Sequence, residues 1–153
     1  YSALKDVNCA AKKGYGNKQG RTVIRVMMSI WDKDHDDIAN LLSALSKKKC
    51  DVSVAIATNA DKTDGGVLKI LKNAPFPTYS ASVDGRSMHS KMVGISGTVN
   101  GRGQALVYDG SLNFAARDTA KNDEIVLLNR SLPEFKKLLS AFAHVKKYSK
   151  KLA

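Results

Sequence analysis

Short apolar segments alternate with polar loops along this chain, and their periodicity changes between that of a strand and that of a helix. Residues 22–30 are rich in β-branched and apolar side chains and predict a mostly buried strand. Over 36–49, apolar residues recur at spacings of three and four, which predicts a helix with one apolar face that Asp34 can cap. A second buried strand is expected over 51–57. Strand, helix and strand in this order predict a βαβ unit with two parallel strands.

The next apolar segments extend this unit. Residues 65–73 predict a shorter helix, which the prolines that follow it stop. Segments 78–83 and 88–96 flank Asp84-Gly85, a tight-turn signal, and predict an antiparallel hairpin. The remaining expected elements are a short helix within 1–8, strands over 104–109 and 124–128, and an amphipathic helix over 132–147. The pattern predicts an α/β fold: a mixed, mostly buried sheet flanked by helices on both faces, in one domain over 1–153.

Composition narrows the class of protein. A chain of 153 residues can bury its own core, and no apolar run reaches the roughly 18 residues that a membrane span needs. The net charge of +11 attracts anions, so nucleic acid or anionic phospholipid are the expected partners. The alternative is a basic surface that serves solubility alone. Because the chain begins with Tyr1 and shows no signal-peptide pattern, we expect a processed or excised piece of a longer protein.

Cys9 and Cys50 are the two cysteines of the chain. Each lies near a predicted strand, so a disulfide between them would tie the N-terminal segment to the second strand. The even count favours this disulfide, and with it a secreted protein, over two buried thiols. Neither cysteine has zinc-finger spacing to another cysteine or histidine, so no structural metal site is expected.

Ionisable residues interrupt the apolar segment Met88-His-Ser-Lys-Met-Val-Gly-Ile-Ser96. His89 and Lys91 are two residues apart, so on a strand they face the same way. Because burying them without partners is costly, we expect both to open onto a cleft. Ser111 and Asn113 repeat this spacing directly after a predicted strand, and Glu124 follows Asn122-Asp123 at the start of another.

These five side chains suit one reaction. A neutral imidazole can attack phosphorus, and a charged one can protonate a leaving oxygen, which are the two roles open to His89. Lys91, Ser111 and Asn113 can hold the phosphoryl oxygens. Glu124 can accept a hydrogen bond from the second ring nitrogen of His89. The set predicts a phosphodiester site that needs neither metal nor cofactor.

Other polar or aromatic residues have a structural interpretation beside the functional one. The acidic cluster over 34–37 suggests a divalent metal, yet acids at a helix start are what the helix dipole favours, and we prefer the structural role. Trp31 can line the cleft or pack in the core, and both alternatives stay open. Arg86 is a candidate phosphate contact, whereas His144 is expected at the surface.

Together, His-x-Lys at 89–91, Gly-Ser-x-Asn at 110–113 and Asn-Asp-Glu at 122–124 resemble the phospholipase D superfamily, the HKD phosphodiesterases. Residues 23–57 are similar to the βαβ opening of each repeat in that fold. Segments 6–9, 20–25 and 49–52 look most like the second half of secreted bacterial phospholipase D-like proteins. The resemblance makes His89, Lys91, Ser111, Asn113 and Glu124 the motif residues.

The resemblance also implies that two motifs meet across a twofold axis, in a homodimer or with a second phospholipase D-like half. One histidine then becomes covalently phosphorylated, and the other protonates the leaving group. One position departs from the pattern: Ser96 stands where the motif has an aspartate, and Asp109 is a candidate substitute.

The leading hypothesis is therefore a metal-independent phosphodiesterase with a phosphohistidine intermediate that cleaves DNA or RNA. The alternatives are a secreted phospholipase D that acts on phospholipids, and a non-catalytic half that binds phosphate and completes the site of a partner.

Overall fold

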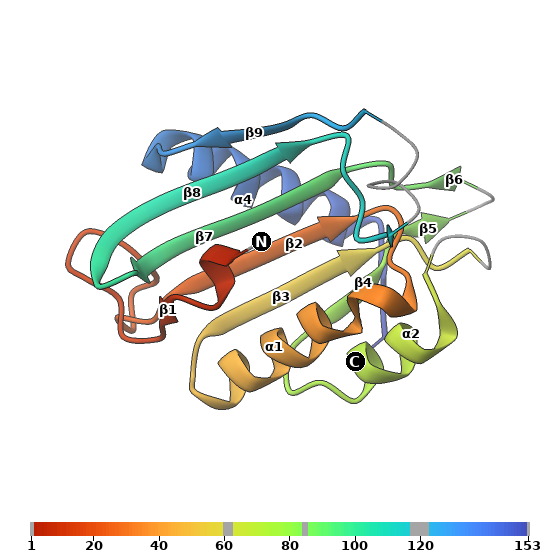
Figure 1. Cartoon of the computed structure of the whole chain (residues 1–153), viewed down its shortest axis with the longest axis horizontal. Coiled ribbons are helices and arrows are strands. Elements are labelled where there is room, and N and C mark those ends of the chain that lie inside the picture. The colour runs from red at the N-terminus through yellow and green to blue at the C-terminus, as the bar shows by residue number, and fades with distance from the viewer. Residues whose placement is uncertain (1, 60–62, 84–85, 117–122, 153) are drawn as a thin grey trace.

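The computed structural model describes residues 2–59, 63–83, 86–116 and 123–152. It has three layers, with one sheet between two layers of helices (Figure 1). Helices α1 (Asp36–Lys47) and α2 (Gly65–Lys72) cover one face of the sheet, and α4 (Leu132–Lys147) covers the other. The predicted α/β class, with helices on both faces of a mixed sheet, is confirmed.

The strands of the sheet follow the order β10-β4-β3-β2-β7-β8-β9, with β1 paired to β7. β2 and β3 are parallel and are joined by α1, as the βαβ prediction requires, whereas β7 is antiparallel to both of its neighbours on this path. The strands are β1 (Val7–Asn8), β2 (Val23–Met28), β3 (Asp51–Ile56), β4 (Thr78–Ser80), β7 (Lys91–Val99), β8 (Arg102–Gly110), β9 (Val126–Asn129) and β10 (Lys150–Lys151).

Alternate residues of the central strands enter two separate cores. In β2, Ile24, Val26 and Met28 pack into the core beneath α1 and α2. Val23 and Met27 pack into the core beneath α4. A strand that is buried on both faces needs an almost continuous apolar sequence, and this explains why the run from 22 to 30 shows no polar alternation.

The hairpin predicted around Asp84-Gly85 is wrong in its main pairing. β4 pairs parallel with β3, and β7 lies between β2 and β8. Only β5 (Ser82–Val83) and β6 (Arg86–Ser87) pair across this position, as a separate two-stranded sheet; Asp84 and Gly85 lie outside the described residues. The turn signal predicts a local reversal of the chain. The buried strand β4, however, forms its backbone hydrogen bonds with β3, in the parallel part of the sheet, and not with β7.

The long hairpin is instead formed by β7 and β8. It reverses at Asn100 and Gly101, whose φ angles of 48° and 71° suit an asparagine and a glycine. Smaller differences concern element ends: the 3-10 helix Ser2–Leu4 precedes β1, and β10 pairs with β4 although no strand was expected there.

The entry into α1 also differs from the prediction. Asp32, rather than Asp34, caps the turn of 3-10 helix Lys33–His35 that precedes α1, because its carboxylate accepts from the Asp34 amide. His35, at the N-cap position of α1, makes no side-chain capping bond.

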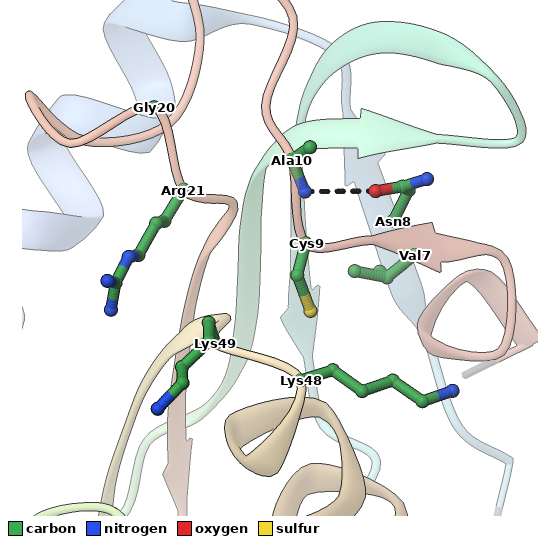
Figure 2. Close-up of a pocket in the computed structure, with 8 residues that line it drawn as sticks. All are labelled: Val7, Asn8, Cys9, Ala10, Gly20, Arg21, Lys48 and Lys49. Atoms are coloured by element: carbon green, nitrogen blue, oxygen red, sulfur yellow. Dashed lines mark hydrogen bonds between the residues drawn. The ribbon is translucent and has the colours of Figure 1, made fainter.

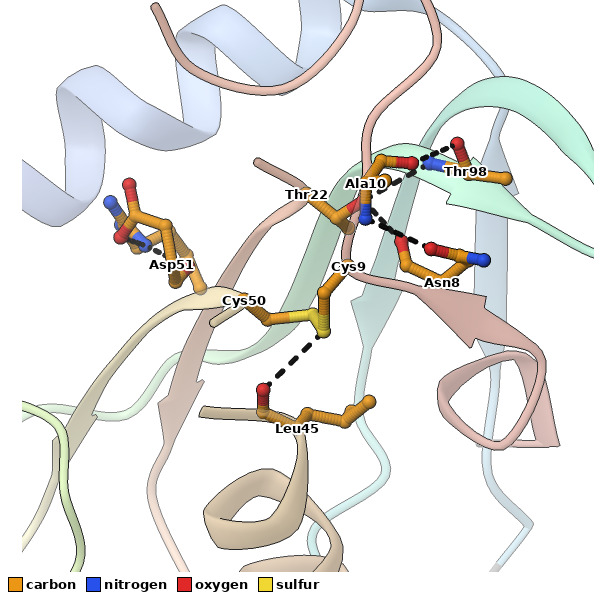
Figure 3. Close-up of a disulfide and its surroundings, with 9 residues drawn as sticks. Asn8, Cys9, Ala10, Thr22, Leu45, Cys50, Asp51 and Thr98 are labelled. Atoms are coloured by element: carbon orange, nitrogen blue, oxygen red, sulfur yellow. Dashed lines mark hydrogen bonds and ion pairs between the residues drawn. A yellow bond between two sulfur atoms is a disulfide. The ribbon is translucent and has the colours of Figure 1, made fainter. Parts of the chain in front are cut away.

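Cys9 and Cys50 form the disulfide that the sequence favoured (Figure 3). The bridge closes a separation of 41 residues and ties the segment after β1 to the residue before β3. It therefore lies at the amino ends of β2 and β3. In the part of the chain that the structure describes, no helix is long and apolar enough to cross a membrane.

Candidate phosphodiester site

The candidate site is built around Ser29 and Ile30, the two residues that follow β2. Ser29 Oγ lies 3.4 Å from Nδ1 of His89, and the Ile30 amide donates to Oδ1 of Asn113 at 3.1 Å. Ser29 and Ile30 thus contact His89 and Asn113, which belong to two different predicted motifs. Sequence reasoning did not single out Ser29, and its one signal was a polar residue near the carboxyl end of an apolar strand.

His89 and Lys91 are in contact, but not through the strand alternation that the sequence suggested. β7 begins at Lys91, so His89 lies just outside the strand. The Lys91 side chain is buried, with 8% of the residue exposed, and Nζ donates to the backbone carbonyl of His89 at 2.9 Å. The imidazole is exposed, and its Nδ1 faces the hydroxyl of Ser29, which is fully buried.

Ser111 and Glu124 form a second pair at the ends of β8 and β9. The Ser111 hydroxyl donates to the Glu124 carboxylate, and the Ser111 amide donates to the Ile125 carbonyl at 3.0 Å. The Ile125 amide returns a hydrogen bond to Ser111 Oγ, also at 3.0 Å. Asn122 of the predicted motif lies outside the described residues. Among the described residues, the hydrogen bond that the sequence suggested between Glu124 and His89 is not formed: Glu124 accepts from Ser111, and Nδ1 of His89 faces Ser29.

A cavity of about 700 Å³ opens beside His89. It is bounded by the segment from Arg86 to Ser90, by His144 and Val145 at the C-terminal end of α4, and by Tyr148 and Ser149, which directly follow that helix. No acidic side chain lines it within the described residues. The candidate phosphate contact Arg86 is therefore on the same cavity as His89, and so is His144, which the sequence placed at the surface.

Ser96, where the motif departs from the family pattern, lies away from this cavity. It is five positions beyond Lys91 along β7, which corresponds to roughly 16 Å in a strand. Its side chain is buried, and Oγ accepts from the amide of Gly16 at 3.2 Å. Asp109, the candidate substitute, is exposed on β8 opposite Met92. The serine therefore anchors the loop that precedes β2.

The remaining candidates have structural surroundings. His35 Nδ1 lies 3.2 Å from the Asp32 carboxylate, and no cluster of three His, Cys, Asp or Glu suited to a metal occurs among the described residues. Trp31 is fully buried against Phe114, with ring centroids 4.6 Å apart, and its indole donates to the His35 carbonyl. Of the two alternatives left open for Trp31, core packing is the one found.

A second cavity, of about 550 Å³, lies at the opposite ends of β2 and β3 (Figure 2). Arg21, Lys48 and Lys49 line it beside Cys9. Part of the excess positive charge therefore lies far from His89, and this cavity contains none of the predicted catalytic residues.

Comparison with known proteins agrees with this architecture. The sequence profile of the family described as "Cardiolipin synthase, PLD-like domain" matches residues 18–146. A phospholipase D family member, Nuc from Salmonella typhimurium, superposes with a TM-score of 0.67 at 19% identity, over 97% of this chain and 87% of that one. NucT from Helicobacter pylori gives 0.57 at 14% identity, with the same coverage. None of the curated proteins matches the chain significantly.

Proposed function

The chain belongs to the family of phospholipase D-like domains, and from this premise we propose that it is a metal-independent phosphodiesterase that cleaves nucleic acid through a phosphohistidine intermediate. One observation carries the proposal: the exposed imidazole of His89 has its Nδ1 held by the buried hydroxyl of Ser29. A nucleophilic histidine must present one nitrogen to the substrate while a hydrogen bond to the other fixes the ring.

The chemistry follows from this orientation. When Nδ1–H of His89 donates to Ser29 Oγ, the lone pair of Nε2 is free to attack phosphorus. The P–N bond forms as the bond to the leaving oxygen breaks, and a second acid gives that oxygen its proton. Water then attacks the phosphohistidine and gives a proton to the conjugate base of that acid. Its oxygen bonds to phosphorus as the P–N bond breaks, so Nε2 regains its lone pair and the acid is restored.

Charge and hydrogen bonds can stabilise the phosphoryl oxygens as negative charge builds on them. Lys91 places an ammonium group beside the His89 backbone, and Asn113 is oriented by the Ile30 amide through its Oδ1, so its amide nitrogen is a second donor. We assign Ser111 to the same oxygens; its hydroxyl donates to Glu124 here and exchanges this partner for phosphate when substrate binds.

One motif supplies one such histidine, so the proposal requires a second copy for the general acid. An apolar segment next to the site supports a homodimer. Ile125 and Leu127 are 67% and 60% exposed, and this segment continues into β9, at the edge of the sheet. Because the Ile125 backbone is hydrogen-bonded to Ser111, a second chain that covers this segment lies close to the site.

The substrate preference rests on the net charge of +11. The second candidate is a phospholipase D, which the description of the matching family as cardiolipin synthase favours. The disulfide supports a secreted protein for either candidate.

The deciding experiment is an assay with DNA, RNA and phosphatidylcholine vesicles in the presence of a chelator, on the wild type and on His89→Ala. We expect cleavage of nucleic acid and covalent phosphate labelling by the wild type, and neither by the variant. Cleavage of lipid alone would replace the substrate assignment. If the variant keeps the activity and the labelling, His89 is not the nucleophile and a phosphate-binding half is the better description.

A further inference from the structure

The C-terminal end of α4 presents two rings to the cavity that contains His89. His144 and Tyr148 are one helical turn apart, and their ring centroids lie 5.1 Å from each other. Both line this cavity, and both are exposed. Of the Phe, Tyr and Trp side chains that the structure describes, Tyr148 is the exposed one, with 59% of the residue accessible.

We propose that Tyr148 and His144 form a base-stacking wall of this cavity, which makes the substrate a single-stranded nucleic acid. The inference rests on the proposed function and deepens it, because it names the form of the substrate. A planar ring offers a stacking surface to any base, and aromatic side chains beside a basic groove are how single strands are held without sequence preference.

The charges around the rings suit a polyanion. Lys147 Nζ lies 5.4 Å from the Tyr148 ring centroid, Arg86 lines the same cavity, and no described acidic side chain lines it. A strand whose base stacks on Tyr148 can therefore place its phosphate among cations near His89. A paired base keeps its faces covered by neighbouring bases, and this is why the wall selects single strands.

The helix end holds the wall in place before substrate arrives. The Tyr148 amide donates to the Val145 carbonyl at 3.1 Å, and Ser149 Oγ donates to the same carbonyl at 2.7 Å. Val145 packs against the core beneath α4. A wall that is already ordered lowers the entropic cost of binding.

Kinetics on matched substrates test the wall in the full chain. The substrates are a single-stranded oligonucleotide, its duplex, and the same strand with abasic sites on both sides of the scissile phosphate. For Tyr148→Leu we expect KM for the intact single strand to rise about tenfold with kcat little changed, while Tyr148→Phe stays within about twofold. KM for the abasic strand should not respond to Tyr148→Leu. An equal rise for the abasic strand, or wild-type cleavage of the duplex as efficient as of the single strand, would overturn the inference.

Binding separates this inference from the proposed function. Fluorescence anisotropy of the labelled single strand on His89→Ala, with and without Tyr148→Leu, needs no turnover. We expect Tyr148→Leu to weaken this binding about tenfold. If His89→Ala still cleaves but the double variant binds tenfold more weakly, the proposed nucleophile fails and the wall stands. If Tyr148→Leu weakens binding to phosphatidylcholine vesicles and not to the strand, the wall belongs to a lipid site and the inference is wrong.

Discussion

Ser29 Oγ, fully buried, lies 3.4 Å from Nδ1 of His89, whose imidazole is exposed. The serine follows β2 and the histidine precedes β7, which is the antiparallel neighbour of β2. This contact between two adjacent strand ends fixes the ring of the proposed nucleophile at the carboxyl end of β2. The contact also predicts that Ser29, which lies outside the recognised motifs, affects the rate of cleavage.

We expect Ser29→Ala to lower kcat by up to about tenfold and to leave KM little changed. The lost hydrogen bond orients the imidazole and does not contact substrate, and one such bond contributes about 1 kcal/mol. Steady-state kinetics with Ser43→Ala as the control check this, since the Ser43 hydroxyl bonds only within α1. A rise in KM with unchanged kcat would contradict the positioning role.

Asn113 is expected to contribute to both stability and activity. Oδ1 accepts from the Ile30 amide, so Asn113→Ala removes this acceptor and is expected to lower the free energy of unfolding by about 1–3 kcal/mol. Asn113→Asp keeps an acceptor there but loses the amide donor, and it places a negative charge on a buried side chain beside the proposed phosphate. We expect the aspartate variant to unfold at a lower urea concentration than wild type and to be strongly impaired in cleavage under conditions in which it stays folded. Equal activity of Asn113→Asp and wild type would remove Asn113 from the site.

Loss of the disulfide should lower stability without disabling the site. The bridge closes a separation of 41 residues, for which the chain-entropy relation gives about 4 kcal/mol. It lies at the amino ends of β2 and β3, whereas His89 lies near their carboxyl ends. The double variant Cys9→Ser, Cys50→Ser is expected to unfold at a markedly lower temperature while keeping its specific activity in the cold. Reductant should lower the wild-type midpoint and leave that of the double variant unchanged.

Asp51 makes stability depend on acid pH. Burial raises the pKa of this carboxyl, but hydrogen bonds from Arg25 and Asn17 lower it by more, so the pKa lies below its ordinary value. A carboxyl whose pKa is lower in the folded state contributes fully above its unfolded pKa of about 4 and loses this contribution as pH falls through the folded value. Asp51→Asn should therefore be less stable than wild type at neutral pH, and the difference should shrink below about pH 4.

Urea midpoints measured across this pH range check the Asp51 prediction. Asp109→Asn is the matched control, because Asp109 is exposed and its loss should leave the midpoint close to that of wild type. If the urea midpoints of Asp51→Asn and wild type differ by the same amount down to strongly acid pH, the carboxylate charge is not the source of the difference.

The exposed apolar segment tests the proposed pairing of two chains. Leu127 is 60% exposed on the edge strand β9, so Leu127→Lys is expected to convert a dimer to a monomer in light scattering. Activity should fall with the dimer, because the proposed general acid comes from the second copy. Ser140→Lys, at an exposed position of α4, adds the same single positive charge elsewhere and should alter neither property. A monomeric wild type with full activity would overturn the pairing.

The sequence alone determined the α/β class and the βαβ unit, because apolar periodicity is a local signal. It also determined the disulfide partners, because two cysteines allow one pairing within the chain. The family resemblance, carried by 89–91 and 110–113, is supported by the family match over residues 18–146. Local signals failed at Asp84-Gly85, where a turn motif indicated a hairpin between segments that the sheet keeps apart.

Only the tertiary structure decided which side chains meet. Sheet order places Ser29 against His89, and helix packing brings His144 and Tyr148 to the same cavity from the far end of the chain. Ser96, the motif departure, proved to be a buried anchor for the loop at Gly16. Such contacts depend on which strands pair and on which face a helix covers, and these are set by burial over the whole chain rather than by the residues near any one motif.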